Sequence, residues 1–477
     1  MSKGRNKQSK RTTSSFASSF SLTGLFSGIS SGQAMVLIAA ALLICVGIVM
    51  VYSASSIESV SNGQPIFSEA AKQILFVFVG VLVVGAMVVL VHRFSMPALI
   101  WVYYWICLVL VAATAVAGTA QYGASRWLSL GGITIQGSEF AKIGFVLIAA
   151  LFLKQAKEEV FSSTLLGSIL FGVFARIRGG VKSERHLADA AIIVFVFLPL
   201  AILLGTQSDL GTTMICVVGV YALLWASGLY SSKLLIAMML AFVAFGVAAI
   251  CTSEYRVQRF TSFTNPWADP DGNGYQHVHS LKALAAGGLF GVGLGGSYQK
   301  LLYLPMASTD FIFAIIGEEL GLVGALGVIC LFLVLLLGGL KIATSSQDSF
   351  ATMVASSLAI MIVFQAFLNI YCVIAFAPIT GKPLPFISSG GSSMLSSVMT
   401  VGLIVLMGMG QAGQGDVHER RRNNLSVVSQ ALPAEQDRRE TTSMVPEYHS
   451  SMNRIRVRSY SADGTRAGTR TSTRRHK

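Results

Sequence analysis

The residue best suited to general-base chemistry in this chain is Asp310. It immediately precedes a long apolar run, with Lys300 ten residues upstream and Glu318 and Glu319 about two helical turns downstream. A carboxylate held where an apolar phase meets water can accept a proton from a hydroxyl group that a substrate presents there. The alternative is that Asp310 only caps the helix that begins beside it.

Polar side chains also gather near residue 140, where another apolar run begins. The segments 122–128 and 136–142 bring together four of them: Arg126, Trp127, Glu139 and Lys142. Charged groups close to a hydrocarbon phase are costly, so their presence there indicates a functional site. Glu139 and Lys142 stand three residues apart on one helical face, and a mutual ion pair is the alternative role for them.

A glycine- and serine-rich stretch, residues 381–393, separates the last two apolar runs. Glycine allows backbone amides to approach a ligand closely, and Lys382 adds a point charge, so the stretch suits a phosphate or pyrophosphate group. The alternative is a re-entrant structural turn. Asp209 also stands between two apolar runs, where it either caps the next helix or lines a site.

Long apolar runs must position these groups. Hydrophobic residues make up 53% of the 477 residues and charged residues 12%, against about 25% charged in an ordinary soluble domain. A bilayer-spanning helix takes roughly 20 apolar residues, so the composition accommodates about ten spans and excludes a soluble enzyme or a disordered protein. The runs predict an all-α polytopic membrane protein with helices near 34–54, 71–91, 97–118, 140–153, 190–207, 210–228, 234–252, 311–340, 352–374 and 393–411. The eighth run is long enough to be a tilted or broken helix.

The excess of basic residues orients the chain. Lys and Arg number 35 and Asp and Glu 22, which gives a net charge of +13. With ten spans, 27 of the 35 basic residues fall on the side of the two termini and 7 on the other. The positive-inside rule then places both termini in the cytoplasm. Topology therefore explains the basic excess, and no nucleic-acid partner is expected. The six cysteines show no spacing typical of a disulfide framework or a zinc site.

The charge and hydropathy pattern divides the chain into three regions. A basic N-terminal tail covers 1–33, a membrane domain covers 34–412, and a basic tail covers 413–477. The membrane domain includes a large extracytoplasmic loop, 253–310, between the seventh and eighth helices. No cleavable signal peptide is evident, because polar and small residues precede the first apolar run. The last tail is expected to be disordered and either contacts lipid or a partner or serves topology and solubility.

Several motifs, in the right order, resemble those of the SEDS family (shape, elongation, division and sporulation), which includes FtsW, RodA and SpoVE. The resemblance runs over most of residues 34–412. It is carried by VYSAS at 51–55, RW at 126–127, SEFAK at 138–142, DLGT at 209–212, NPW at 265–267, YQ at 275–276, DFIFAIIGEELG at 310–321 and LPFISSGGSS at 384–393. The stretch 299–305 is more similar to the FtsW branch than to the RodA branch.

This resemblance implies a peptidoglycan glycosyltransferase that works during division at the outer face of the bacterial cytoplasmic membrane, at the septum. It would join the disaccharide units of lipid II by β-1,4 bonds and release undecaprenyl pyrophosphate. Asp310 matches the family's essential aspartate, the proposed general base. The expected substrate-binding residues are Arg126, Trp127, Glu139, Lys142, Asp209, Gln276, Ser280, Lys300, Lys382, Ser388, Gly390 and Ser392.

The resemblance also implies a cofactor and partners. Basic groups such as Arg126, Lys300 or Lys382, or a divalent cation (Mg²⁺ or Mn²⁺), would offset the charge on the leaving group. A class B penicillin-binding protein would supply the transpeptidase, and other division proteins would join them.

The chain departs from the family's pattern at three places. Ser208 stands where Pro is usual, Met306-Ala-Ser308 where Glu-Ala-His is usual, and His279 where Gln is usual. The missing Glu and His weaken any scheme in which they assist catalysis, but they leave the aspartate intact.

Two other functions fit a ten-span protein. One is a transporter that moves lipid II across the bilayer, and the other is a non-catalytic division scaffold that recruits partners through its tails. A transporter should carry polar residues along a path through the membrane, whereas here they gather at the predicted outer face. Their position favours chemistry outside the membrane.

Overall fold

The computed structural model describes residues 29–121, 124–130, 133–161, 184–207, 209–251, 257 and 262–409. The predicted tail 413–477 and most of the predicted tail 1–33 lie outside these residues, as does part of the predicted loop 253–310.

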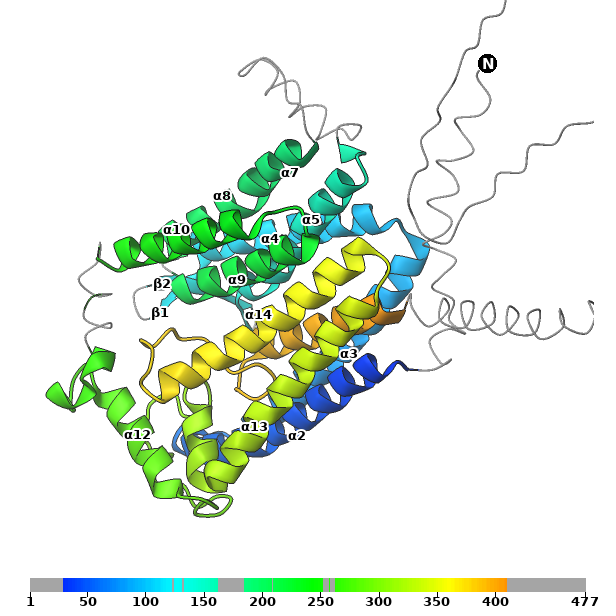
Figure 1. Ribbon diagram of the computed structural model, residues 1–477. Helices are drawn as coiled ribbons and strands as arrows, with labels where there is room; N and C mark the ends of the chain where they lie inside the picture. The colour runs from blue at the N-terminus through cyan, green and yellow to red at the C-terminus, as the bar shows by residue number, and fades with distance from the viewer. Residues whose placement is uncertain are drawn as a thin grey trace, which may run out of the picture. The chain divides into compact units, whose positions relative to one another are not determined.

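Helices make up most of the described chain (Figure 1). In order they are α2 (Ser31–Ser61), α3 (Ser68–Arg93), α4 (Met96–Ala117), α5 (Gly137–Lys157), α7 (Glu184–Ile192), α8 (Leu198–Gln207), α9 (Leu210–Ser227), α10 (Ser232–Cys251), α12 (Tyr275–Gly287), α13 (Ile312–Ser345), α14 (Ser349–Val373) and a last helix, Gly391–Met409. A π-helical turn, Ile193–Phe197, joins α7 to α8.

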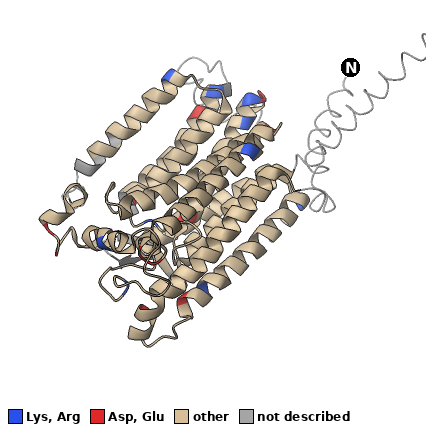
Figure 2. Cartoon of the chain, turned by 60° about the horizontal axis from the view of Figure 1, so that its bottom comes forward, with Lys and Arg blue, Asp and Glu red and all other residues tan. Residues whose placement is uncertain are grey.

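Eight stretches of helix in the described chain are long and apolar enough to cross a membrane: α2, α3, α4, α7 with α8, α9, α13, α14 and the last helix. The other two predicted spans coincide with α5, which carries charged residues near both ends, and with α10. Figure 2 shows that Lys, Arg, Asp and Glu lie mostly at or near helix ends, with long uncharged stretches between them. The predicted all-α polytopic class is confirmed.

Side-chain caps fix where three of the helices begin. Ser30 and Gln33 form a reciprocal capping box at the start of α2. Asp209 caps α9 and Asp348 caps α14, each by accepting a backbone N–H of the first turn. Such caps satisfy amides that have no partner inside the helix, which is why these polar residues stand directly before apolar runs.

The antiparallel pair α2 and α13 defines the two ends of the bundle. At one end the two backbones come close, since a β-carbon at Gly32 would lie 3.1 Å from the Gly338 carbonyl oxygen. At the opposite end Ser53 of α2 donates a hydrogen bond to Glu319 of α13 at 2.7 Å. We call this second end, which also holds the loop 374–390, the site end.

Of the two possibilities for the eighth apolar run, a tilted or a broken helix, the structure shows a break at Gly321 of α13, where φ is 68° and ψ is −167°. The segment that follows α12 inserts its backbone at this break. Four hydrogen bonds of 3.0 to 3.2 Å join it to both halves of the helix, with the N–H donor named first: Val292 to Glu318, Gly293 to Glu319, Leu322 to Gly288 and Val323 to Leu289. The backbone N–H and carbonyl groups beside the break are therefore hydrogen-bonded even though the helix is interrupted.

We expect Gly321→Ala to lower the stability of the protein by about 1–3 kcal/mol, because its backbone lies in a region that side chains rarely adopt. A new β-carbon would also lie 2.6 Å from the Leu289 carbonyl oxygen. The measurement is the thermal unfolding temperature in detergent. Gly327→Ala is the matched control, since nothing lies within 4 Å of its β-carbon position on the same helix and alanine favours helix. Equal unfolding temperatures for the two variants would contradict the prediction.

A small antiparallel sheet interrupts the helices between α4 and α5. Its strands, in the order β1-β2-β3, are β1 (Thr119–Gln121), β2 (Ala124–Leu130) and β3 (Ile133–Ile135). The all-α prediction did not include it, because β1 and β3 have only three residues each, too few for a clear alternating pattern. Arg126 and Trp127 lie on β2, and Trp127 is half-buried. The side chain of Arg126 lies outside what the structure describes.

Candidate functional site

Three lysine–carboxylate pairs are buried among the residues that the structure describes. They are Lys142–Glu139 at 2.7 Å, Lys382–Asp209 at 2.8 Å and Lys300–Glu319 at 2.8 Å. No side chain of the six is more than 5% exposed. Every lysine that the sequence offered as a ligand for phosphate is therefore already paired with a carboxylate.

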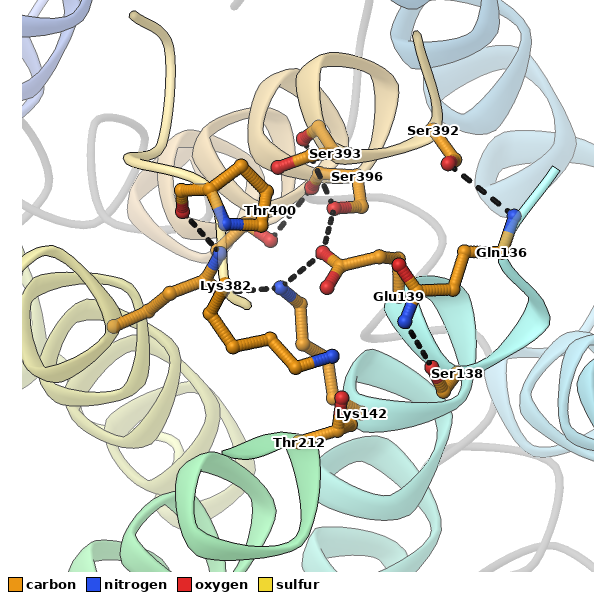
Figure 3. A network of polar contacts seen from close by, with 12 residues as sticks. Gln136, Ser138, Glu139, Lys142, Thr212, Lys382, Ser392, Ser393, Ser396 and Thr400 are labelled. Carbon is orange, nitrogen blue, oxygen red and sulfur yellow. Dashed lines mark hydrogen bonds and ion pairs between the residues drawn. The ribbon is translucent and has the colours of Figure 1, made fainter. Parts of the chain in front are cut away.

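The pair Glu139–Lys142 joins three helices through a polar network (Figure 3). Lys142 of α5 also donates to Gln365 Oε1 of α14 at 2.6 Å, and Ser396 of the last helix donates to Glu139 Oε2 at 3.2 Å. The ion pair expected from the three-residue spacing is confirmed. Its burial gives both residues a structural role in holding α5, α14 and the last helix together.

Asp209 caps α9 and also pairs with a lysine from a distant loop. One carboxylate oxygen accepts the Thr212 N–H at 3.1 Å, and the other lies 2.8 Å from Lys382 Nζ. A β-carbon at Gly211 would lie 2.9 Å from Lys382 Cγ, so the absence of a side chain there leaves room for the lysine. The capping prediction is right, and the ion pair ties the loop 374–390 to the start of α9.

Asp310 lies half-buried at the start of α13, beside the loop that follows α14. Asn369 of α14 connects the two, because its Nδ2 donates to the carbonyl oxygens of Asp310 at 2.7 Å and Lys382 at 2.9 Å. A β-carbon at Gly381 would lie 3.7 Å from Asp310 Oδ2. The N-cap residue of α13 is Phe311, one position after Asp310.

Two serines connect the loop 374–390 and the last helix to neighbouring segments. Ser388 of the loop donates through its Oγ to the carbonyl oxygen of Thr309, next to Asp310, at 2.6 Å. Ser392, in the first turn of the last helix, accepts the N–H of Gln136 through its Oγ at 3.3 Å. The first contact holds the loop against the residue before Asp310, and the second holds the last helix against the start of α5.

Lys300 connects the large loop to α2 and α13. Its Nζ lies 2.8 Å from Glu319 Oε1 and 2.9 Å from Ser53 Oγ, and the residue is 7% exposed. Nearby, the Ser297 hydroxyl and the Tyr298 N–H donate to Glu318. The segment just before Asp310 is thus held by two carboxylates of the first half of α13.

We expect Lys300→Met to lower the free energy of unfolding by about 1.5–3 kcal/mol, the value of hydrogen bonds to a charged group. The loss is limited because Ser53 continues to donate to Glu319. Thermal unfolding in detergent measures it. Lys282→Met, at an exposed site on α12, is the matched control and should leave the free energy of unfolding within about 0.5 kcal/mol of the parental value. A similar small effect in both variants would contradict the anchoring role of Lys300.

The remaining predicted site residues lie at the periphery of this arrangement. Gln276 is half-buried on α12, and Ser280 of the same helix is buried and donates to the carbonyl oxygen of Val373 at 2.6 Å. Gly390 lies directly before the last helix. The structure therefore pairs Asp209 with Lys382 and places two other residues of the loop 374–390, Gly381 and Ser388, beside Asp310 and its neighbour Thr309.

Sequence reasoning missed the polar residues inside α14 that connect the site. Gln365 binds Lys142 and donates to the Pro383 carbonyl oxygen at 3.0 Å, and Asn369 bridges Asp310 and Lys382. A signal was present: these two amides stand four residues apart within a long apolar run, and therefore on one helical face.

A resident metal ion would need several His, Cys, Asp or Glu side chains close together. The described part of the chain contains no group of three or more His, Cys, Asp or Glu side chains that could hold a metal ion. The acidic side chains of the buried pairs have lysine partners, which reduces their value as cation ligands. Within the described ranges, these donors do not form a resident metal site.

Comparison with known proteins places this arrangement in a family. The model of the cell cycle protein family FtsW/RodA/SpoVE matches residues 33–411. Stage V sporulation protein E of Bacillus subtilis is 34% identical over 378 residues, covering 79% of this chain and 96% of that protein. The probable peptidoglycan glycosyltransferase FtsW of Shewanella sediminis is 36% identical over 393 residues, covering 81% of this chain and 87% of that protein.

Solved structures agree on the fold. A chain of a structure described as "structural coordination of polymerization and crosslinking by a peptidoglycan synthase complex" aligns with a TM-score of 0.56 at 23% identity, over 78% of this chain and 96% of that one. The rod shape determining protein RodA of Thermus thermophilus aligns with a TM-score of 0.51 at 24% identity, over 78% and 94%. With most of the membrane domain matched, this chain belongs to the FtsW/RodA/SpoVE family of cell cycle proteins.

Proposed function

We propose that this protein is a peptidoglycan glycosyltransferase that polymerises lipid II into β-1,4-linked glycan at the outer face of the cytoplasmic membrane. The observation that carries the proposal is the family match over residues 33–411. Relatives that this chain covers over most of their length are named as probable peptidoglycan glycosyltransferases. The structure supports it through Asp310, a half-buried carboxylate at the end of the bundle where the buried ion pairs gather.

Asp310 acts as the general base in this proposal. Its carboxylate takes the proton of the acceptor 4-hydroxyl while that oxygen forms a bond to the anomeric carbon of the donor sugar. The bond between the anomeric carbon and the pyrophosphate oxygen breaks, and undecaprenyl pyrophosphate leaves with the electron pair. Two lipid-anchored substrates held side by side gain a large effective concentration.

The leaving pyrophosphate needs positive charge, and the buried lysines already have carboxylate partners. We propose that Lys142, Lys300 and Lys382 position the loops, and that Arg126 of β2 is the basic residue that meets the pyrophosphate. A divalent cation, Mg²⁺ or Mn²⁺, would enter with the pyrophosphate oxygens, since such cations are commonly held by substrate phosphates and few protein ligands. It would offset negative charge on the leaving group.

The orientation, partner and location belong to the same proposal. The basic excess of the sequence puts both termini in the cytoplasm and the site end outside. A class B penicillin-binding protein would crosslink the glycan, and the FtsW-like motif at 299–305 points to the division septum with other division proteins.

The test is to supply purified protein and its class B partner with lipid II in proteoliposomes. Glycan polymer on a denaturing gel is the expected result. Translocation of labelled lipid II without polymer would replace the proposal by a transporter. Absence of both would leave a scaffold, a role that needs neither the buried pairs nor the half-buried carboxylate.

A further inference from the structure

The segment 288–306, between α12 and Asp310, exposes most of its apolar side chains and buries its polar residues Ser297, Gln299 and Lys300. Exposed members include Leu289, Phe290, Leu294, Tyr298, Leu302 and Met306, with Phe290 81% exposed. Ser297, Gln299 and Lys300 are buried, and Lys300 is the one charged residue in the segment. A loop surrounded by water normally shows the opposite arrangement, because exposed apolar patches of this extent are rare on soluble surfaces.

The depth of this segment follows from its attachment to α13. Its backbone is hydrogen-bonded to α13 on both sides of Gly321. From Leu322 to Lys341, the basic residue near the other end, α13 rises about 29 Å at 1.5 Å per residue. The hydrocarbon core of a bilayer is about 30 Å thick. Gly321 and the segment bonded to it therefore lie at the opposite boundary of the hydrocarbon.

The exposed apolar surface of the segment continues onto the membrane-spanning part of α13. Leu322, Val323 and Leu326 are each about half exposed and follow directly after the break. The segment adds two tyrosines, Tyr298 and Tyr303, whose rings stack at 4.7 Å. Tyrosine is enriched at membrane–water interfaces, where its ring meets lipid and its hydroxyl meets water.

We propose that residues 288–306 are seated in the outer lipid leaflet, at the level of the interface, and set the height of Asp310 above the hydrocarbon. The assignment to the outer leaflet and the link to a lipid-borne substrate rest on the proposed function, whereas the contact with lipid does not. Lys300 and Ser297 bind Glu319 and Glu318 in the first half of α13. These buried contacts connect the segment 288–306 rigidly to the start of that helix. Lipid is favoured over a protein partner because the surface is continuous with α13 and carries no exposed charge.

The direct test places the photoreactive residue p-benzoylphenylalanine at position 290 or 294 of the full chain. The protein is reconstituted in vesicles of phosphatidylethanolamine and phosphatidylglycerol, irradiated without substrate, and analysed by mass spectrometry. Lipid adducts are expected at both positions. Position 273 is the matched control, since Asn273 is exposed in a turn with two nearby aspartates and should give none.

Other outcomes overturn the proposal. Lipid adducts at 290 and 294 no more abundant than at 273 would place the segment in water. An adduct with a class B penicillin-binding protein in the reconstituted complex, without lipid adducts, would make the surface a protein interface. These readouts need no enzymatic activity, so they stand or fall separately from the proposed glycosyltransferase function.

A functional arm uses Phe290→Asp combined with Leu294→Asp, against Phe290→Leu as the conservative variant. Charges at a lipid seat should raise the KM for lipid II in vesicles several-fold while the unfolding temperature in detergent changes little. Phe290→Leu should keep the parental KM. An unchanged KM in the double variant would contradict a seat that sets the height of Asp310.

Discussion

Asp310→Asn is expected to reduce glycan polymerisation from lipid II by about 100-fold or more, the range typical of losing a general base. Asparagine has nearly the same shape but cannot take the proton of the acceptor hydroxyl at neutral pH. The backbone carbonyl of residue 310, which accepts from Asn369, is retained, so the fold should be preserved. The measurement is polymer formed by the purified complex, with unfolding temperature recorded in parallel.

The control for this experiment is Asp271→Asn, the same chemical change at an exposed acid of the same large loop. It should polymerise at the parental rate. Full activity in Asp310→Asn would remove the general-base assignment. A parallel loss in Asp271→Asn would show that the assay responds to loop charge rather than to proton transfer.

Lys382→Met is expected to lower the free energy of unfolding by about 3–5 kcal/mol, because it removes the positive charge paired with the buried carboxylate of Asp209 and leaves that carboxylate with neutral hydrogen-bond donors such as the Thr212 N–H. Both side chains of this pair are fully buried. Adding Asp209→Asn should recover much of the loss, since asparagine caps a helix about as well as aspartate and carries no charge. Thermal unfolding of the single and double variants measures this coupling.

Lys72→Met provides the matched control for the buried pair. Lys72 pairs with Glu69 at 2.7 Å, but its side chain is 54% exposed, and such pairs contribute less than about 1 kcal/mol. Similar losses for Lys72→Met and Lys382→Met, or no recovery in the double variant, would contradict a central role for the Lys382–Asp209 pair.

Much of the fold was predictable because its signals are local. In lipid, the backbone N–H and C=O groups of an apolar run of about 20 residues find hydrogen-bond partners within the run itself only if it forms a helix, whatever its neighbours are. The same reasoning applies to the cap at Asp209 and the pair Glu139–Lys142, whose partners stand three residues apart. The small sheet was missed, since two of its three strands have only three residues and leave almost no periodic pattern.

The sequence by itself determined the membrane class and the approximate spans, and it supplied Asp310 as the predicted general base, through hydropathy and motifs that need no knowledge of packing. The tertiary structure decided what surrounds that aspartate. It showed that Lys300 and Lys382 bind Glu319 and Asp209, the second pair separated by 173 residues along the chain. Which distant charges meet depends on how all the helices pack, and no local spacing encodes it.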